Sequence, residues 1–550
     1  MHAAPRRPGR LAALLCALLA VALVAARAAG AQSAPPLGWQ DCGQPPDVQP
    51  SAVQCAMQTV PLDYDSPTGS TIQIAVARVP AKDQAHRIGS LLFNLGGPGA
   101  PAVDFLQATA GQGLFDTLNQ RFDIVAFDPR GTGQSSPSID CKANQERLGL
   151  YAQPFPTPSA LHLRALLRKD RAYFARCLSL VPRSILAHDS TADVARDMDV
   201  LRRAVGDAKL TYLGFSYGTF LGATYAALFP RSFRALVLDG PVDADQFIND
   251  PVASTDEQTA ALERALGRFF AACAANQTAC ARFGGRDPWD AYDRLVARAQ
   301  ATRLPAPRYT PDPRPIDGDD INQAAVSAMY DKRFWPALAL GLRQAARGDG
   351  SVIRLIVDEL SYMRDPDTGQ YDPSNDAFVA IDGGEPKWPT RVGEYVREGE
   401  EAWGKYDHAY FNQGYTELGF GLWPVRAQDA YFGPFHVDAS APAPLVVDTT
   451  YDPATPYRGG LMLARELGHA RVLTMRGDGH TAYGENSPCI NRAVNAYLID
   501  GTLPPAGKSC RQQVPCAQPS GRAAATSVAR PTAAVQRALR SLLHDKPLVR

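Results

Sequence analysis

The sequence predicts an α/β fold in which a mostly parallel β-sheet carries helices on both faces. Three observations lead to this prediction. Short apolar runs alternate with amphipathic helical segments over residues 71–242, a long helical and polar stretch then interrupts the alternation, and the alternation resumes over residues 442–517. Strands that alternate with helices pair in parallel, because each crossover helix returns the chain to the same end of the sheet.

The first block of alternation contains the clearest individual elements. Runs rich in Val, Ile, Leu and Phe predict strands, and segments with apolar residues at helical spacing predict helices. The helix expected over residues 191–206 has its apolar residues Val194, Met198, Leu201 and Val205 on one face. The predicted strands lie within residues 71–80, 89–95, 122–136, 210–214 and 233–242, and the other predicted helices lie within 102–113 and 218–230.

Residues 243–441 interrupt the sheet pattern. This segment is mostly helical and polar, with stretches rich in Pro and Gly, and a long insertion over the carboxyl edge of a sheet has the form of a lid. The core therefore consists of two parts, residues 32–242 and residues 442–517. Within the second part we expect strands over 443–450 and 470–475 and a helix over 489–500.

Both ends of the chain read as segments outside the fold. Residues 1–31 combine an Arg-rich start, a short apolar run and a small-residue cleavage site after Ala31, which predicts a signal peptide and an exported protein, secreted or periplasmic. Cys16 lies inside the apolar run after bulky leucines, which does not match a lipoprotein signal. No later segment reads as a membrane helix. Residues 518–550 are a low-complexity tail of unknown role.

Charge and cysteine content restrict the partners and the compartment. Lys plus Arg and Asp plus Glu each number 56, so the balance gives no indication of nucleic acid or an anionic membrane surface as partner. Cysteines in an exported chain predict disulfides, and nearness in sequence suggests four pairs, with one cysteine left free. These pairs are Cys42–Cys55, Cys141–Cys177, Cys273–Cys280, and Cys489 with either Cys510 or Cys516. The cysteines and histidines lack zinc spacing, and we expect no metal and no cofactor.

Ser216 is the candidate nucleophile. It stands in the sequence Gly-Phe-Ser-Tyr-Gly between the strand expected at 210–214 and the helix that follows. A serine at the apex of a sharp strand-to-helix turn takes a strained backbone conformation. Its neighbours two positions away must then be small, or the strand and helix collide.

The candidate acid and base follow later strands. A serine hydroxyl needs an imidazole to remove its proton, and the imidazole needs a carboxylate to fix its tautomer. Asp452 follows the strand expected at 443–450, and His480 follows the strand at 470–475. Both loops belong to the carboxyl edge of a parallel sheet, where ligands gather. Of the nine histidines, only His480 has this context.

Two neighbours of Asp452 have other interpretations. Asp448 is an alternative acid, but its place within the strand favours a buried or locally paired carboxyl. Thr455 and Pro456 read as the N-cap and first residue of a helix that would anchor the Asp452 loop. The chain order Ser216, Asp452, His480 is the order of an α/β-hydrolase.

A glycine-rich loop, residues 94–101, follows the strand at 89–95. In this position a loop supplies one amide of an oxyanion hole, because glycines let backbone N–H groups approach a developing negative charge. We expect the Gly97 amide to be one donor. The amide of Tyr217, directly after the nucleophile, is the expected second donor.

Together these motifs resemble a known family. The segments NLGGPG, FDIVAFDPRGTGQSS, LGFSYGTFLGATYAALFP, VLDGPVD, DPATP and GDGHTAY are similar to those of secreted α/β-hydrolase peptidases related to proline iminopeptidase, in the tripeptidyl-aminopeptidase-like branch. The resemblance covers about Asp41 to Cys516 and implies a triad of Ser216, Asp452 and His480. It also implies removal of short peptides or single residues from free N-termini. Asn94 and Leu95 depart from the histidine-led loop of proline iminopeptidases and favour the tripeptidyl branch.

The expected function is therefore that of an exported serine aminopeptidase acting on peptides with a free N-terminus. Such an enzyme must recognise an α-ammonium group, and Asp243 and Asp245 are the candidate carboxylates. An esterase or other acyl hydrolase with the same triad is the alternative, because one scaffold supports many chemistries. A non-catalytic protein on the same scaffold is a third possibility, which an intact triad and oxyanion loop disfavour.

Overall fold

The structure is a computed structural model that describes residues 36–42, 53–110, 113–150, 160–310, 312–409, 415–484 and 486–514. The predicted signal peptide, the predicted tail and Cys516 lie outside the described residues.

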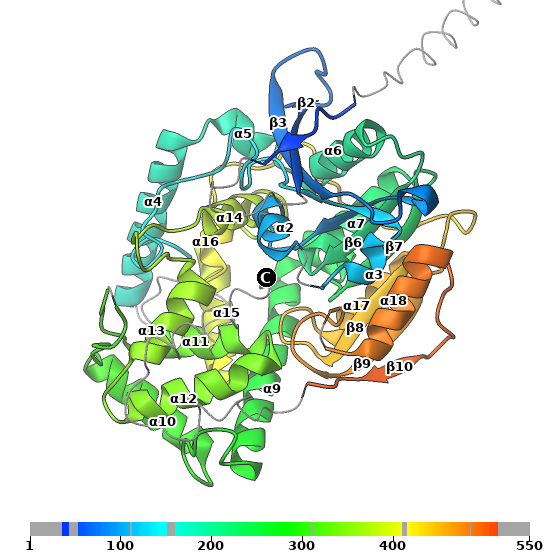
Figure 1. Cartoon of the computed structure of the whole chain (residues 1–550). Helices are drawn as coiled ribbons and strands as arrows, with labels where there is room; N and C mark the ends of the chain where they lie inside the picture. Colours follow the sequence, from blue (N-terminus) through cyan, green and yellow to red (C-terminus); the bar gives the residue numbers. More distant parts are fainter. Residues whose placement is uncertain are drawn as a thin grey trace, which may run out of the picture.

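The core is one sheet of ten strands in the order β1-β2-β3-β5-β4-β6-β7-β8-β9-β10 (Figure 1). Strand β2 pairs antiparallel with β1 and with β3, and β3 pairs antiparallel with β5. The remaining neighbours, from β5 through β4 and β6 to β10, pair in parallel. The strands are Gln40–Asp41, Gln54–Pro61, Thr71–Val79, Gly89–Asn94, Phe122–Phe127, Leu210–Phe215, Phe233–Asp239, Leu445–Tyr451, Arg471–Asp478 and Ser509–Arg511. The predicted α/β class with a mostly parallel sheet is confirmed.

Helices cover both faces of this sheet, and each face has its own apolar layer. One layer joins α6, α7 and α17 to the sheet through residues such as Met198, Phe220 and Leu463. The other joins α2, α3 and α18 through residues such as Leu106 and Ile490. The core helices are α2 Val103–Thr109, α3 Asp116–Asn119, α4 Ala160–Leu180, α5 Arg183–Ala187, α6 Thr191–Ala204, α7 Tyr217–Leu228, α17 Tyr457–Glu466 and α18 Pro488–Asp500.

Alternate residues of each buried strand face opposite layers, because side chains along a strand point alternately to its two sides. In β4, Leu92 belongs to the layer with α7, whereas Leu91 and Phe93 belong to the layer with α2. All six residues of β4, β5 and β6 are buried. These strands are buried on both faces and are mostly apolar, as expected for the centre of a parallel sheet.

Between β7 and β8 the chain forms a helical insertion of nine α-helices within the described residues, and it divides into two halves (Figure 1). After α8, the first half, α9 to α13, is packed around an apolar core of its own, which includes Phe269, Trp335 and Ile353. The second half, α14 to α16, shares the apolar layer of α6 and α7 through residues such as Tyr395 and Phe420. The helices are α8 Ala244–Asn249, α9 Pro251–Ala275, α10 Pro288–Ala301, α11 Gly318–Met329, α12 Trp335–Ala346, α13 Ser351–Val357, α14 Ser374–Gly384, α15 Val392–Lys405 and α16 Leu418–Gly421, with short helical turns η2 Lys332–Phe334 and η3 Asp358–Tyr362.

Four disulfides join the predicted cysteines: Cys42–Cys55, Cys141–Cys177, Cys273–Cys280 and Cys489–Cys510. Cys489 thus pairs with Cys510, the nearer of its two predicted partners. This bond ties the start of α18 to β10 at the edge of the sheet.

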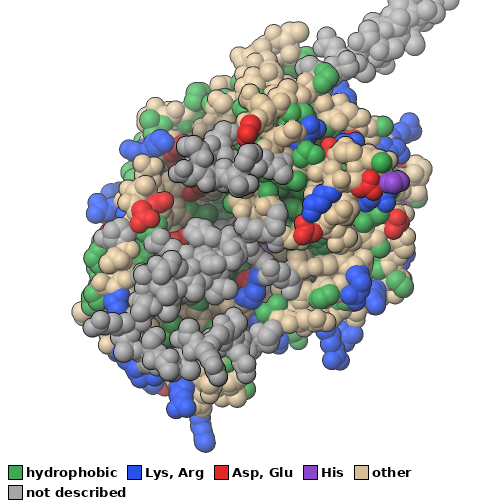
Figure 2. Space-filling model, in the orientation of Figure 1, with side chains coloured by type: hydrophobic (Ala, Val, Ile, Leu, Met, Phe, Trp, Pro, Cys, Tyr) green, Lys and Arg blue, Asp and Glu red, His purple; other side chains and the backbone are tan. Residues whose placement is uncertain are grey.

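Among the described residues, none of the helices has the length and apolar character needed to cross a bilayer. The face shown in Figure 2 carries acidic and basic side chains side by side around its rim. This mixture agrees with the equal numbers of the two charges in the sequence.

Candidate active site

Ser216 stands at the apex of the turn between β6 and α7. Its backbone has φ 54° and ψ −125°, a conformation that strains a residue with a side chain. A Cβ on Gly214 would lie 2.3 Å from the carbonyl oxygen of Gly218, and a Cβ on Gly218 would lie 2.8 Å from Asn94 Oδ1. Both glycines are therefore required for the strand and helix to meet at this angle, as the spacing predicts.

Asp452 and His480 come together beside this turn. His480 Nδ1 lies 2.9 Å and 2.8 Å from the two carboxylate oxygens of Asp452. The carboxylate also accepts hydrogen bonds from the backbone N–H groups of Ala454, Thr455 and Thr481 at 2.8–3.2 Å. The acid is 1% exposed and the histidine 6%. The carboxylate is thus fixed by its own loop and presents both oxygens to the imidazole.

The other ring nitrogen of His480, Nε2, is buried and has no hydrogen-bond partner among the described residues, Ser216 included. Hydrogen bonds of catalytic groups are often long before substrate binds. Ser216 and His480 are brought to the same edge through Asp239 at the end of β7. The Ser216 N–H donates to the Asp239 carbonyl at 2.9 Å, and the neighbouring Gly240 lies directly against the His480 ring.

The Asp239 carboxylate supports the loop after His480. It accepts hydrogen bonds from the N–H groups of Ala482 and Tyr483 at 2.7–3.1 Å. Burial raises the pKa of Asp239 to about 7, and the two hydrogen bonds lower this pKa by less than burial raises it. This carboxyl was not among the sequence candidates. Its position at the carboxyl end of a parallel strand is the signal that could have identified it.

Asp448, the alternative acid, does not reach His480. It is fully buried in β8, and neither carboxylate oxygen has a hydrogen-bond partner among the described residues. Burial, and to a smaller extent repulsion from the Asp452 carboxylate, raises the pKa of Asp448 well above its usual value. Asp448 is therefore a buried carboxyl that makes no hydrogen bond to His480.

The predicted N-cap at Thr455 is wrong. Pro456 is the residue that precedes helix α17, and it has an extended conformation with φ −56° and ψ 138°. The helix therefore starts at Tyr457, one residue later than predicted. The Thr455 hydroxyl instead lies 3.3 Å from His480 Nδ1, next to the Asp452 contact.

The two expected oxyanion donors border the same cavity as Ser216. Gly97 has φ 100°, and a Cβ there would lie 2.9 Å from the Gly99 backbone nitrogen. Tyr217 is the first residue of α7, so its N–H has no acceptor within the helix. Asn94 helps to shape the loop, because its Oδ1 accepts a hydrogen bond from the Gly96 N–H at 2.9 Å.

The Tyr217 side chain is linked to the insertion through Thr191 and Glu385. Its hydroxyl is hydrogen-bonded to the Thr191 hydroxyl, and the Thr191 N–H donates to Glu385 Oε1 at 3.0 Å. Glu385 follows directly after α14, and burial raises its pKa to about 8. The second half of the insertion therefore contacts the nucleophile turn through buried polar groups.

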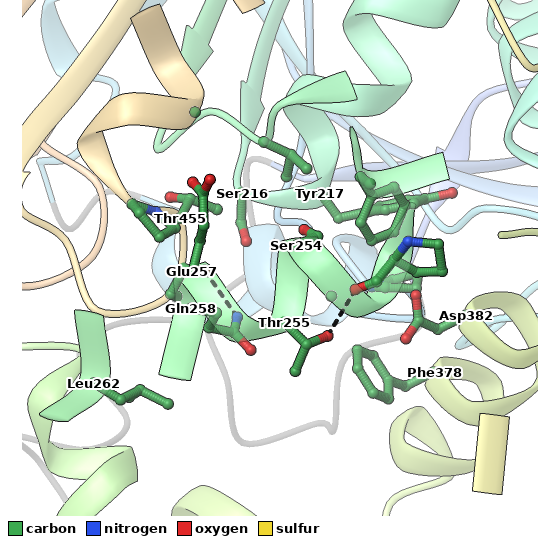
Figure 3. A pocket seen from close by; sticks show the side chains of 18 of the residues that line it. Ser216, Tyr217, Ser254, Thr255, Glu257, Gln258, Leu262, Phe378, Asp382 and Thr455 are labelled. Carbon is green, nitrogen blue, oxygen red and sulfur yellow. Dashed lines mark hydrogen bonds between the residues drawn. The ribbon is translucent and has the colours of Figure 1, made fainter. Parts of the chain in front are cut away.

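A cavity of about 180 Å³ lies over Ser216, between the core and both halves of the insertion. In Figure 3, Ser216 points into the same space as Ser254 and Thr255 of α9 and Asp382 of α14. The rest of the wall is largely apolar and aromatic, with Leu262, Phe378, Trp388 and Phe420 among its residues.

The candidate amine-binding residues fall in different places. Asp243 borders the cavity, but its carboxylate caps α8 by accepting from the Gln246 N–H at 3.0 Å. Asp245 is exposed, is not among the residues that line the cavity, and pairs with Asn249. The acidic residue that the sequence reasoning missed is Asp382, which lines the cavity and is 7% exposed.

Asp382 is a buried carboxyl beside the cavity. Its Oδ1 is buried with no hydrogen-bond partner among the described residues, and burial raises its pKa to about 7. Glu257 and Glu417 also line the cavity. A single acid in the apolar run Phe-Val-Ala-Ile-Asp is the sequence signal that could have pointed to Asp382.

The expectation of no metal stays a prediction. Two groups of described side chains have ligand atoms close enough to share an ion: Asp63 with His188 and Asp429, and Glu263 with Asp407 and His408. Neither group is among the residues that line the cavity over Ser216.

Comparison with known proteins identifies two family models along the chain. The model described as alpha/beta hydrolase fold matches residues 90–277, which include Ser216. The model described as TAP-like protein matches residues 414–510, which include Asp452 and His480.

Curated relatives match over most of the chain. "Serine protease Hip1" of Mycobacterium tuberculosis is 35% identical over 91% of this chain and 98% of its own length. "Carboxylesterase B" of the same organism is 34% identical over 87% of this chain and 90% of its own. "Tripeptidyl aminopeptidase" of Streptomyces lividans is 31% identical, over 87% of each chain. This chain therefore belongs to the TAP-like family of α/β-hydrolase peptidases and is a serine hydrolase.

Proposed function

We propose that this protein is an exported serine aminopeptidase that releases short peptides, tripeptides in particular, or single residues from free N-termini. The observation that carries the proposal is the cavity over Ser216, which is covered by the insertion and lined by Asp382, a buried carboxyl with an unpaired oxygen. A covered cavity with an acidic residue suits a chain end that carries an ammonium group, whereas an endopeptidase needs an open groove.

In the proposed reaction, Ser216 Oγ attacks the scissile carbonyl carbon while His480 Nε2 takes its proton. Asp452 holds the Nδ1–H side of the ring, so that Nε2 is the nitrogen that faces the serine. The N–H groups of Gly97 and Tyr217 stabilise the negative oxygen of the tetrahedral intermediate. His480 then passes the proton to the leaving amine, and water releases the N-terminal fragment from the acyl-enzyme by the same steps.

Asp382 is the proposed anchor for the substrate ammonium, and Asp243 also lines the cavity. A bound ammonium would pair with the Asp382 oxygen that lacks a hydrogen bond. Asp245 has no part in this proposal because it is exposed and does not line the cavity.

The alternative function is an esterase or other acyl hydrolase that uses the same triad. The relative named "Carboxylesterase B", at 34% identity, supports it. An ester substrate without an amine would gain nothing from Asp382, so the two functions predict different behaviour of the same variant.

The test compares a decapeptide with a free N-terminus, its N-acetylated form and short acyl esters, with product masses measured for each peptide. We expect cleavage of the free peptide near its N-terminus and little cleavage of the acetylated form. Asp382→Asn should raise KM for the free peptide about 10- to 100-fold, the range for losing a hydrogen bond to a charged group. Its turnover of short esters should stay unchanged.

The controls separate catalysis from binding. Ser216→Ala should abolish hydrolysis of every substrate and labelling by a fluorophosphonate reagent. Preference for esters, with equal cleavage of free and acetylated peptides, would refute the aminopeptidase proposal and support the alternative.

Export is part of the proposal. Four disulfides support an oxidising compartment, because such bonds seldom persist in the cytosol. The signal-like residues 1–31 support it independently. Fractionation of cells that express the full chain should place the mature protein outside the cytoplasm, with an N-terminus near residue 32.

A further inference from the structure

The loop that carries His480 is attached to the first half of the insertion. The His480 N–H donates to the carbonyl of Tyr330 at 2.7 Å, and the two rings meet edge to face at 5.4 Å. Tyr330 follows directly after α11. A Cβ on Gly479 would lie 2.9 Å from the Tyr330 carbonyl oxygen, so glycine is needed there for the loop and the insertion to approach.

Two cations of the insertion converge on Asp478, two residues before His480. Lys332 Nζ lies 2.7 Å from Asp478 Oδ2, and Arg268 Nε donates to Oδ1. The carboxylate is 6% exposed, and burial alone would raise its pKa. The hydrogen bonds from Arg268 and Lys332 outweigh burial and hold the pKa of Asp478 below its usual value. Asp478 is therefore an anion at neutral pH.

Arg268 also reaches the loop that carries the acid. Its guanidinium lies 3.5 Å above the ring of Tyr451, the residue before Asp452. Earlier in the same helix, α9, Gln258 Nε2 donates to the carbonyl of Ala454 at 2.8 Å. Helix α9 thus contacts both the acid loop and the base loop, and the guanidinium of Arg268 spans the two.

We propose that Arg268, Lys332 and Asp478 are positioning residues that hold His480 in line with Asp452 and Ser216 while the first half of the insertion is docked on the core. The inference rests on the proposed serine hydrolase mechanism. The first half of the insertion has an apolar core of its own, so it can shift as a unit. Its contacts with the two loops at Asp478 and Ala454 are polar, and such contacts can break and re-form as substrate enters.

This arrangement makes alignment of the base depend on docking. When the insertion moves away, the base loop loses its contacts with Tyr330, Lys332 and Arg268 together. When the insertion docks over a bound peptide, the contacts return and Nε2 faces Ser216. Closure around the substrate and alignment of the base thereby become the same event.

The test uses Lys332→Met and Asp478→Asn. We expect kcat to fall about 10- to 100-fold, which is the effect of displacing a reacting group by roughly 1 Å, with KM changed much less. The rate of labelling of Ser216 by a fluorophosphonate should fall in parallel, because it also needs the activated serine. Lys332→Arg, which keeps the cation, should restore most of the rate.

Lys405→Met is the control for the loss of an exposed ion pair. Lys405 makes an equally short ion pair with Asp256, also at 2.7 Å and also within the insertion, and this pair touches neither catalytic loop. The control should leave kcat and labelling unchanged. Lys332→Met and Lys405→Met should melt within about 2–4 °C of the parent, as expected for the loss of one ion pair, whereas Asp478→Asn removes two ion pairs.

The outcomes distinguish this inference from the proposed function. If Lys332→Met and Asp478→Asn retain the kcat and labelling rate of Lys405→Met, the contacts are ordinary ion pairs and the inference is wrong. Equal failure of Lys332→Arg and Lys332→Met would also overturn it. Fluorophosphonate labelling does not depend on a peptide substrate, so the inference can hold even if the natural substrate is an ester. A parent protein that the reagent fails to label would instead refute the serine mechanism itself.

Discussion

Replacing Asp382 by Asn should stabilise the protein, and the gain should grow with pH. Burial raises the pKa of this carboxyl from 3.8 to about 7, so the folded chain keeps the proton over a range in which the unfolded chain has lost it. The folded state thus binds more protons than the unfolded state between these values, and stability falls as pH rises from about 4 to 7. Asn has no proton to lose, so the variant escapes this penalty.

The size of the effect follows from the two pKa values. Each tenfold difference in acid strength corresponds to about 1.4 kcal/mol, so the charged carboxylate destabilises the fold by about 4 kcal/mol at pH 8. At pH 5 the same calculation gives about 2 kcal/mol. Any effect of the Asn amide itself is the same at both pH values. The gain in unfolding free energy from Asp382→Asn should therefore be about 2–3 kcal/mol larger at pH 8 than at pH 5.

Urea unfolding of the parent and the variant at the two pH values measures this difference. Asp376 in the same helix provides the control, because its carboxylate accepts hydrogen bonds from Cys141 N–H, Gln145 and Tyr173 at 2.7–2.8 Å. Burial raises the pKa of Asp376 only to about 6, so the change in stability on Asp376→Asn should differ between pH 5 and pH 8 by about half as much as for Asp382→Asn. A stability gain for Asp382→Asn that is equal at pH 5 and pH 8 would refute the reasoning.

Three further perturbations test the framework of the site. Gly218→Ala should reduce kcat by more than tenfold without removing the fold, because its Cβ would meet Asn94 Oδ1 at 2.8 Å and shift the nucleophile turn; unchanged kinetics would contradict the proposed strain. Replacing Cys489 and Cys510 by Ser should lower the unfolding free energy by about 3 kcal/mol, the value expected for opening a loop of this length, as measured by urea unfolding. Asp239→Asn should lower kcat about tenfold with little change in KM, because one oxygen replaces the two that hold the loop after His480; a purely KM effect would argue against this role.

The core and the contact of Asp452 with His480 were predictable because their signals are local or follow from parallel pairing. Ser216 needs small residues at fixed spacing, and that spacing is visible in five letters of sequence. Asp452 and His480 follow strands of one parallel sheet, so their loops had to meet at one edge. The pairing of His480 with Asp452 rather than Asp448 follows from the same rule, because Asp448 lies inside β8.

The wall of the cavity was not predictable in the same way. Which acidic residue faces the cavity depends on how each helix of the insertion is rotated, and that rotation is set by packing between elements distant in sequence. Asp245 is exposed, whereas Asp382 faces the cavity from a helix more than a hundred residues later. The start of α17 was misplaced for a different reason, since Pro456 adopts an extended rather than a helical conformation.

The separate apolar core of helices α9 to α13 has a consequence for how such an enzyme can diversify. Side chains such as Gln323 and Val326 of α11 form part of the cavity wall, yet the layer behind them belongs to their own helices and not to the sheet. Substitutions there can reshape what fits beside the nucleophile without repacking the strands that strain Ser216. A lineage could thus acquire new substrate preferences through one half of a single insertion, while the chemistry beneath it stays as it was.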